Sequence, residues 1–361
     1  LFAIVNTLFK DNLLSIERVA DHLNGLDELK KITADYTPEF VSSFCGIEAH
    51  EIRRIARELA TASKAAVYGR MGTCTQAFGT ITTWLINVIN TLTGNLDSEG
   101  GVMFTNPAAG GITEKSKRRK EGKIHYKRFL SRVRKAPEVL GELPVNCMAE
   151  EIETPGEGQV KALLTFAGNP ALSAPNSKRL QNAFEQLDFM VSIDIYLNET
   201  TRYANVILPA PSPLEKAHYD LALYKFSVRN ISNYSEPVFP LDPGILDEWE
   251  IILRLMAEIS EENFGNDPVG ECDHALITGM IAKEVREVKS PIYGREVSDI
   301  LDSLSGRQGP DRMLDFLIRV GPYGDHFGKN HNGLTLSFLK EHPHGVDLGQ
   351  LKSRIPEVLL T

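Results

Sequence analysis

The sequence KALLTFAGNPALSAPNSKRLQNAFEQLDFMVSIDIYLNETTRYANVILPA, residues 161–210, decides the fold. Three apolar runs each stop at turn residues: 162–167, 189–196 and 206–208. An amphipathic run at 177–187 separates the first two, so we predict strand, helix, strand, short helix, strand. This alternation indicates parallel strands buried on both faces. Ligands bind such sheets at the carboxyl ends of the strands, here 168–173 and 193–196.

A second unit of this kind is expected near the beginning of the chain. It consists of a short buried strand at 64–68, the turn GRMGT at 69–73 and a helix to about Leu92. The two glycines allow close backbone approach and Arg70 adds a positive charge, so the turn suits an anion. The turn has neither GxGxxG nor Walker spacing. A tight turn that needs glycine only for its geometry is an equally good interpretation.

The composition is that of a globular protein with two or three domains. The chain has 361 residues, of which 42% are hydrophobic and 24% charged. The net charge of −9 argues against general nucleic-acid binding. No apolar run approaches the roughly 20 residues that a membrane span needs. The opening LFAIVNTLFK is spaced like a helix already under way, so we expect the chain to start inside a larger polypeptide.

Neither the cysteines nor the histidines have the spacing of a metal site. The cysteines stand far apart, at Cys45, Cys74, Cys147 and Cys272. We therefore expect no disulfide framework, no metal cluster and a reducing, cytoplasmic location. Cys45 and Cys74 are expected to pack as small apolar residues within helices. Exposed or backbone-bonded side chains are expected for the histidines of the last region, His326, His331, His342 and His344.

The segment 115–135 is strongly basic, with eleven Lys or Arg residues and one acidic residue, Glu121. One interpretation is attraction of an anionic cofactor, substrate or redox partner. The preferred interpretation is a solvated, mobile surface loop. Because only Tyr126 and Phe129 interleave with the charges, a base-stacking surface for nucleic acid is not favoured.

Several segments together resemble the molybdopterin oxidoreductases, which include formate dehydrogenases, nitrate reductases and dimethyl sulfoxide reductase. In order, they are YTPEFVSSFCGI with HEIRRIARELA, VYGRMGTCTQAFGT, LTGNLDSEGGVMF, AGNPALSAPN, VSIDIYLNETTRYANVILP and SPLE. The tail segments LIRVGPYGD, LTL and PHGVDLG look like the region before the family's final barrel domain. Order and spacing match over nearly the whole chain.

The resemblance implies an α/β fold with two parallel-sheet units of the formate dehydrogenase and dimethyl sulfoxide reductase type, similar to domains 1 to 3 of the family. Residues 1–105 are expected to form part of one dinucleotide-binding domain, and 106–154 a loop or insert that carries the basic stretch. Residues 155–260 are expected to form the second dinucleotide-binding unit. Residues 261–361 would be a helical segment and a linker towards a C-terminal domain.

The family binds two molybdopterin guanine dinucleotides around one molybdenum. One dinucleotide would contact Gly69, Arg70, Met71, Gly72, Thr73 and Gln76, and the other Gly168, Asn169, Pro170 and Ser173. Asp194 matches the acid that faces the second guanine, where a carboxylate accepts from N1–H and the exocyclic amine. A capping or turn role is the alternative for Asp194. Asn205 replaces the aspartate that the family usually has in its ADVILP string, which removes a charge.

The function implied is that of the central portion of a molybdenum-dependent oxidoreductase, inactive alone. The family's iron–sulfur cysteines and molybdenum ligand lie upstream of the matched region, so we assign no catalytic residue and no metal ligand. An iron–sulfur cluster would belong to that upstream part, and whether this chain alone holds a cofactor stays open. Expected partners are the remaining domains of the parent chain and electron-transfer subunits, without nucleic acid or membrane insertion.

Two alternatives remain from the sequence. One is a non-catalytic structural homologue within a redox complex, and the other is a free-standing guanine-nucleotide-binding protein. Glu215, His218 and Asp220 follow the last central strand. These three residues would line a substrate funnel or form a surface turn.

Overall fold

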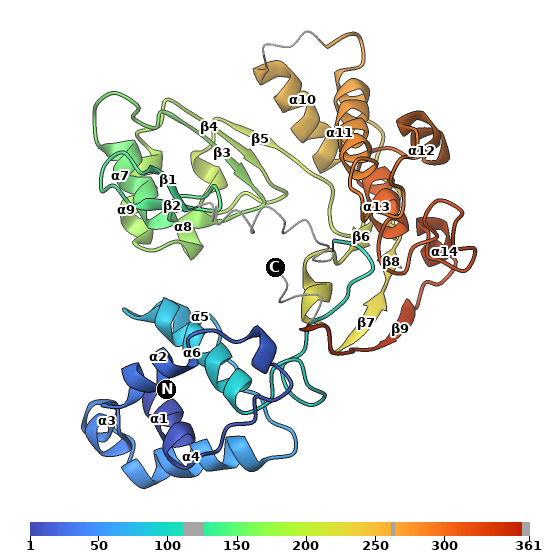
Figure 1. Ribbon diagram of the computed structural model, residues 1–361. Coiled ribbons are helices and arrows are strands. Elements are labelled where there is room, and N and C mark those ends of the chain that lie inside the picture. The colour runs from blue at the N-terminus through green and yellow to red at the C-terminus, as the bar shows by residue number, and fades with distance from the viewer. Residues whose placement is uncertain (111–125, 261–263, 356–361) are drawn as a thin grey trace. The chain divides into compact units, whose positions relative to one another are not determined.

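The computed structural model describes residues 1–110, 126–260 and 264–355 (Figure 1). The chain divides into two compact units. Unit 1 comprises Leu1–Asn106, Leu223–Asn230 and Asp347–Thr361, and unit 2 comprises Pro107–Ala222 and Ile231–Val346. Each unit is therefore assembled from segments that are distant in sequence.

Unit 1 is mainly helical in its described residues. Its helices are α1 (Phe2–Lys10), α2 (Leu26–Thr33), α3 (Pro38–Cys45), α4 (Ala49–Thr61), α5 (Met71–Cys74) and α6 (Gly79–Leu92). Helix α3 begins as the sequence indicates, because the Thr37 side chain accepts a hydrogen bond from the Phe40 amide at 3.2 Å. Leu8 of α1 and Leu85 and Ile89 of α6 are buried in one apolar core.

Residues 64–68 differ from the expected strand because no strand of the described residues pairs with them. The amide of Val67 donates to Asn90 Oδ1, and Asn90 Nδ2 donates to the Val67 carbonyl, both at 2.8 Å. A side-chain amide carries both a donor and an acceptor, so Asn90 takes the place of a neighbouring strand. The parallel sheet expected in this unit is therefore not formed by its described residues.

Unit 2 contains the parallel sheet that the sequence predicts. Its strands are β3 (Ala162–Phe166), β4 (Phe189–Ile193) and β5 (Val206–Leu208), in the order β3-β4-β5. In the parallel register Ala162 lies beside Phe189, and Val191 beside Val206. The α/β fold class is confirmed, and the helix expected at 177–187 is α9 (Ser177–Phe184). The structure adds a short helix that the sequence analysis did not predict, α8 (Pro170–Ser173), between β3 and α9.

The sheet is covered on both faces, as an apolar parallel sheet requires. Met190 packs with side chains of α7 (Met148–Glu153) and α9. Ile193 points to the other face, because residues three apart in a strand face opposite sides, and packs with Ile251 of α10 (Glu248–Ile259).

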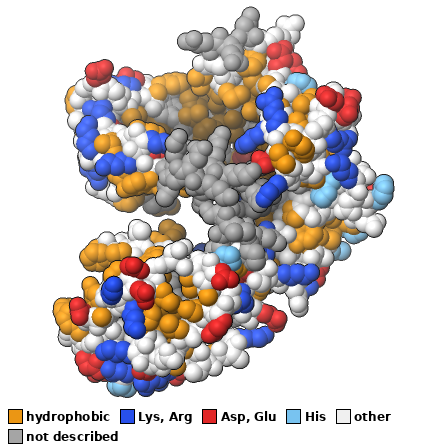
Figure 2. Space-filling model, in the orientation of Figure 1, with side chains coloured by type: hydrophobic (Ala, Val, Ile, Leu, Met, Phe, Trp, Pro, Cys, Tyr) orange, Lys and Arg blue, Asp and Glu red, His pale blue; other side chains and the backbone are white. Residues whose placement is uncertain are grey.

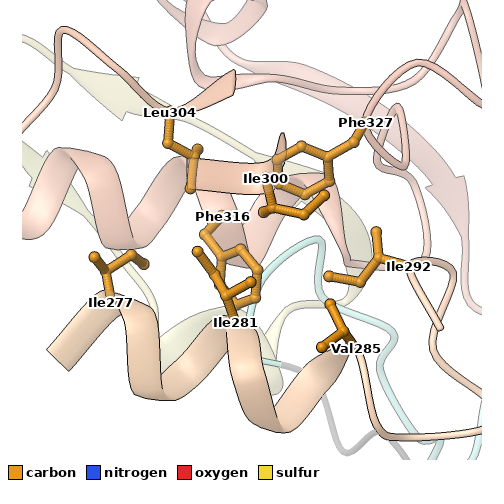
Figure 3. Packing of buried hydrophobic residues seen from close by; sticks show 8 residues of the cluster. All are labelled: Ile277, Ile281, Val285, Ile292, Ile300, Leu304, Phe316 and Phe327. Carbon is orange, nitrogen blue, oxygen red and sulfur yellow. The ribbon is translucent and has the colours of Figure 1, made fainter. Parts of the chain in front are cut away.

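A second core in unit 2 lies among helices that follow the sheet (Figure 3). The helices that contribute to this core are α11 (Pro268–Glu284), α12 (Val297–Ser303) and α13 (Gly309–Arg319), and α14 (Leu336–Lys340) comes later in the chain. Ile277 and Ile281 project from one face of α11 towards Phe316 of α13, and all three are at most 2% exposed. Two short strands, β6 (His218–Tyr219) and β8 (Tyr234–Ser235), pair antiparallel. Strands β7 (Arg229–Ser232) and β9 (Val346–Gln350) pair with each other.

The described end of the basic segment is an ordered hairpin rather than a mobile loop. Residues 111–125 lie outside the described residues. Strands β1 (Tyr126–Leu130) and β2 (Pro137–Val139) pair antiparallel. Their region contains three ion pairs: Arg128 with Glu138, Arg132 with Glu151, and Arg134 with Glu150. Because these arginines are matched by buried glutamates, this end of the segment serves packing rather than long-range attraction of anions.

Low pH is expected to destabilise this hairpin because Glu138 becomes protonated. Its side chain is fully buried, and its hydrogen bonds with the Arg128 guanidinium and with the amides of Arg128 and Gly141 lower its pKa to about 2. The unfolded value is roughly 4.3, so the stabilisation is complete above that pH and is lost as the pH falls towards 2. Hydrogen exchange of the hairpin amides should show declining protection over this window. Glu138→Gln should flatten the decline, whereas the exposed Glu142→Gln should leave it unchanged.

Candidate functional site

The candidate site in unit 2 lies where β3 and β4 end. The chain turns directly after β3 at Ala167, whose φ of 44° lies in the left-handed region. The amide of Ala167 donates to the Ile193 carbonyl at 2.8 Å. The structure therefore brings Gly168 and Asn169 to the same edge as Asp194, as the topology predicts.

The start of helix α8 has few free amide groups. The Ala171 amide donates to Thr200 Oγ1 at 2.9 Å. The amides of Leu172 and Ser173 both donate to the Asn169 carbonyl, and Pro170 has no N–H. Because these donors are already occupied, the start of α8 offers few free N–H groups to a phosphate group.

Asp194 is half-buried and each of its carboxylate oxygens accepts one hydrogen bond. Oδ1 accepts from the Tyr196 amide at 3.0 Å, and Oδ2 accepts from Asn198 Nδ2 at 3.2 Å. The turn role considered from the sequence is therefore present. Since each carboxylate oxygen can accept a second bond, the residue also keeps capacity for a ligand's N–H groups.

Three residues that the sequence analysis did not single out hold this edge together: Asn198, Glu199 and Thr200. Thr200 Oγ1 donates to Asn169 Oδ1 at 2.7 Å, and Glu199 Oε2 accepts from Asn169 Nδ2 at 2.7 Å. Asn198 links to Asp194, as described above. The signal available in the sequence was the polar run NETTR at 198–202, a few residues after β4, on the side of the sheet where ligands are expected.

The turn at 69–73 in unit 1 has a different character. Its Arg70 side chain is exposed, and none of the other described residues forms a hydrogen bond or ion pair with it. The Thr73 side chain donates to the Arg70 carbonyl at 2.7 Å, and Gln76 Nε2 donates to the Gly72 carbonyl at 3.1 Å. Both polar side chains stabilise the turn, and the guanidinium remains available to an anion.

The two glycines of this turn are needed for different reasons. A Cβ at Gly69 would lie 2.5 Å from Ile86 Cδ1 and 2.8 Å from Thr73 Oγ1, so a larger residue there would force these two side chains to move. A Cβ at Gly72 would meet no atom within 4 Å. The geometric interpretation of the turn therefore holds for Gly69, while Gly72 leaves open space beside Arg70.

Large apolar side chains near this turn are exposed. Figure 2 shows that apolar side chains, in orange, also lie on the visible surface of unit 1. Tyr68, Met71 and Phe78 are between 72% and 77% exposed. The expectation that Cys45 and Cys74 pack inside was wrong, since both are exposed. Each cysteine lies at or next to the end of a short helix, and the apolar pattern of the sequence does not reveal that such an end faces outward.

Two other sequence expectations have direct outcomes. The His326 ring bonds to the Gly321 carbonyl at 3.0 Å and the His342 ring to the Phe338 carbonyl at 2.7 Å, which confirms backbone-bonded histidines at these positions.

Asn205 Oδ1 accepts from the Met190 amide at 2.7 Å. An amide oxygen accepts this bond as a carboxylate would, so the change from aspartate leaves the strand contact intact.

A cavity of about 1190 Å³ lies elsewhere in unit 2, between the β6–β8 ladder and helices α10 and α13. Glu215 and His218 line it, whereas Asp220 does not. Its charged walls are internally paired, for example Lys216 with Glu248 at 2.7 Å and Lys340 with Asp311 at 3.2 Å. This pairing gives the cavity no clear preference for a charged ligand.

A parallel sheet with polar side chains gathered at its carboxyl edge defines an α/β protein in which a ligand is expected at that edge. A family model described as molybdopterin oxidoreductase matches residues 46–256, more than half of the chain. The chain belongs to this family, which implies oxidoreductase chemistry and a molybdenum–pterin cofactor.

Curated relatives agree with this assignment. The chain is 28% identical over 278 residues to the F420-dependent formate dehydrogenase subunit alpha of Methanocaldococcus jannaschii, covering 71% of this chain and 38% of the relative. It is 28% identical to formate dehydrogenase H of Escherichia coli, covering 81% and 40%. It is 26% identical to the arsenate respiratory reductase subunit ArrA of a Shewanella species, covering 82% and 38%. The chain thus spans about two fifths of the length of these relatives.

A solved structure supports the fold. Acetylene hydratase from Pelobacter acetylenicus matches with a TM-score of 0.58 at 18% identity, covering 72% of this chain and 38% of that chain. Among the described residues, no helix combines the length and apolar character needed to cross a membrane.

Proposed function

We propose that this chain supplies two half-sites for molybdopterin guanine dinucleotide in a molybdenum-dependent oxidoreductase. One half-site comprises Gly69, Arg70, Met71, Gly72, Thr73 and Gln76, and the other comprises Gly168, Asn169, Pro170, Ser173 and Asp194. The observation that carries the proposal is the carboxylate of Asp194, which is held by two hydrogen bonds at the ligand-binding edge of the sheet and can accept more.

The residues present fit such a ligand. A guanine presents N1–H and an exocyclic amine, and a fixed carboxylate can accept from both. The exposed guanidinium of Arg70, with open space at Gly72, suits a phosphate group. When bound, the cofactor would supply the redox chemistry through its metal, and the residues named here would bind and orient its nucleotide portions.

Several wider features belong to the same proposal. Because the chain spans about two fifths of its relatives, we propose that a complete active site needs further parts of the enzyme. The relatives from M. jannaschii and Shewanella are themselves named as subunits, which supports electron-transfer partners for this protein. A cytoplasmic location is proposed from the widely spaced cysteines.

The direct test is titration of the 361-residue chain with GMP by calorimetry or NMR. Asp194→Asn should weaken GMP binding roughly tenfold, because a charge-assisted hydrogen bond is worth about 1.5 kcal/mol or more. The matched control is Asp188→Asn, an exposed aspartate at the opposite end of β4 that lies 3.7 Å from Lys161. Equal affinities of the Asp194→Asn variant and the unaltered chain would contradict the assignment.

A further inference from the structure

Glu199 is the one charged side chain among the three linking residues of the β3–β4 edge. Its Oε2 accepts from Asn169 Nδ2 at 2.7 Å, and the side chain is otherwise exposed. This hydrogen bond, together with the positive charge of Arg202, lowers the pKa of Glu199, so the carboxylate is ionised at neutral pH. Oε1 takes part in no hydrogen bond with the other described residues.

Among the residues that the structure describes, the charge around this edge is therefore negative. Asp194 and Glu199 are linked through adjacent residues, because Asn198 bonds to Asp194 and Glu199 bonds to Asn169. In the described part of the chain, the cation whose charge acts on Glu199 is Arg202. Its Nη2 donates to the Tyr203 hydroxyl at 3.0 Å, and its guanidinium lies 5.0 Å from the Tyr203 ring centre. Two carboxylates against one guanidinium repel a phosphate group.

The backbone amide groups at the edge also disfavour a phosphate group. The N–H groups of Ala171, Leu172 and Ser173 are all occupied by Thr200 Oγ1 or the Asn169 carbonyl. A phosphate would need such donors, whereas a ligand that itself carries N–H donors needs acceptors. The edge offers acceptors, in the remaining capacity of Asp194 and in Glu199.

We propose that Glu199 is a specificity-determining residue that makes this edge select an uncharged base with N–H donors, such as guanine, and reject a phosphate group. This inference rests on the proposed function and adds to it the residue that excludes a phosphate group from the place where the base would lie. Glu199 acts in two ways: it fixes the Asn169 side chain, and its charge disfavours an anion at the same place.

The test compares guanosine with GDP on the full chain by calorimetric titration. Glu199→Gln keeps a carbonyl oxygen that can accept from Asn169 but removes the charge. The ratio of GDP affinity to guanosine affinity should rise about three- to tenfold in this variant, and the rise should shrink at high salt, where charge interactions are screened. The control is Glu185→Gln, the same change at an exposed residue that ends α9.

Three results would overturn the idea in distinguishable ways. If Glu199→Gln leaves the GDP to guanosine ratio unchanged while the unaltered chain binds guanosine, Glu199 does not determine specificity and the proposed function survives. If Glu185→Gln raises the ratio as much as Glu199→Gln does, the effect is one of overall charge. If the unaltered chain binds neither guanosine nor GDP, the proposed half-site itself fails, and the inference fails with it.

Discussion

Asp97→Ala is expected to lower the stability of unit 1 by roughly 3 kcal/mol, because it removes the shared acceptor of three donors. Asp97 is fully buried, and its Oδ2 accepts from the Ser353 hydroxyl at 2.8 Å and from the amides of Arg354 and Ile355 at 2.5 and 2.8 Å. Without the carboxylate these donors would be left without an acceptor, and the segment Ser353–Ile355 would lose its main attachment.

Hydrogen exchange measures this effect locally, which avoids treating a chain of two units as a two-state folder. Protection of the Arg354 and Ile355 amides should fall roughly a hundredfold in Asp97→Ala, which corresponds to about 3 kcal/mol. Asp35→Ala changes an exposed aspartate of the same unit and should have no such effect. Unchanged protection at these two amides in Asp97→Ala would show that other contacts hold the segment.

The sheet of unit 2 was predictable because its determinants are local. Each of its three strands is an apolar run of three to eight residues that ends at turn residues, and burial on both faces of a parallel sheet requires such runs. The same locality explains the correct start of α3, since Thr37 and its acceptor role depend only on residues up to Phe40.

The extended segment at 64–68 could not be predicted in the same way, because a strand exists only with a partner. Its sequence is apolar enough for a strand, yet its backbone partner is the side chain of Asn90, 23 residues from Val67. The ion pairs of the arginines in the basic segment could not be predicted for the same reason. Nothing local in that sequence indicates that Arg134 pairs with Glu150 and Arg132 with Glu151.

Only the location of the candidate site could be predicted from the sequence, because its hydrogen bonds join residues that are distant in the chain. Topology alone places Asn169 and Asp194 at one edge, because both follow parallel strands. The hydrogen bonds that fix them come from Asn198, Glu199 and Thr200, up to 31 residues from their partners. Which acceptors and donors are left for a ligand depends on these bonds, so the chemistry of the edge requires the folded structure.

Thr200→Val is expected to damage this site by removing the hydroxyl that holds the Asn169 side chain in place. Thr200 is fully buried, and its hydroxyl donates to Asn169 Oδ1 at 2.7 Å while accepting from the Ala171 amide at 2.9 Å. Valine has nearly the same shape but no hydroxyl, so the half-buried Asn169 Oδ1 and the buried Ala171 amide both lose their partner. Leaving such groups unsatisfied costs about 1–3 kcal/mol each. The Asn169 side chain could then leave the position in which its Nδ2 donates to Glu199.

Two readouts separate positioning from simple loss of stability. Thr200→Val should reduce the thermal stability of unit 2 and, below its melting temperature, should also weaken GMP binding at least fivefold, because the Asn169 side chain is no longer fixed. Thr200→Ser keeps the hydroxyl and loses one methyl group, which costs about 1 kcal/mol, so it should lose stability but bind GMP normally. If the serine and valine variants bind GMP equally well, the hydroxyl supports the fold without positioning Asn169. If the serine variant binds GMP normally and the valine variant does not, the Thr200 hydroxyl, on the loop after β4, positions the Asn169 side chain.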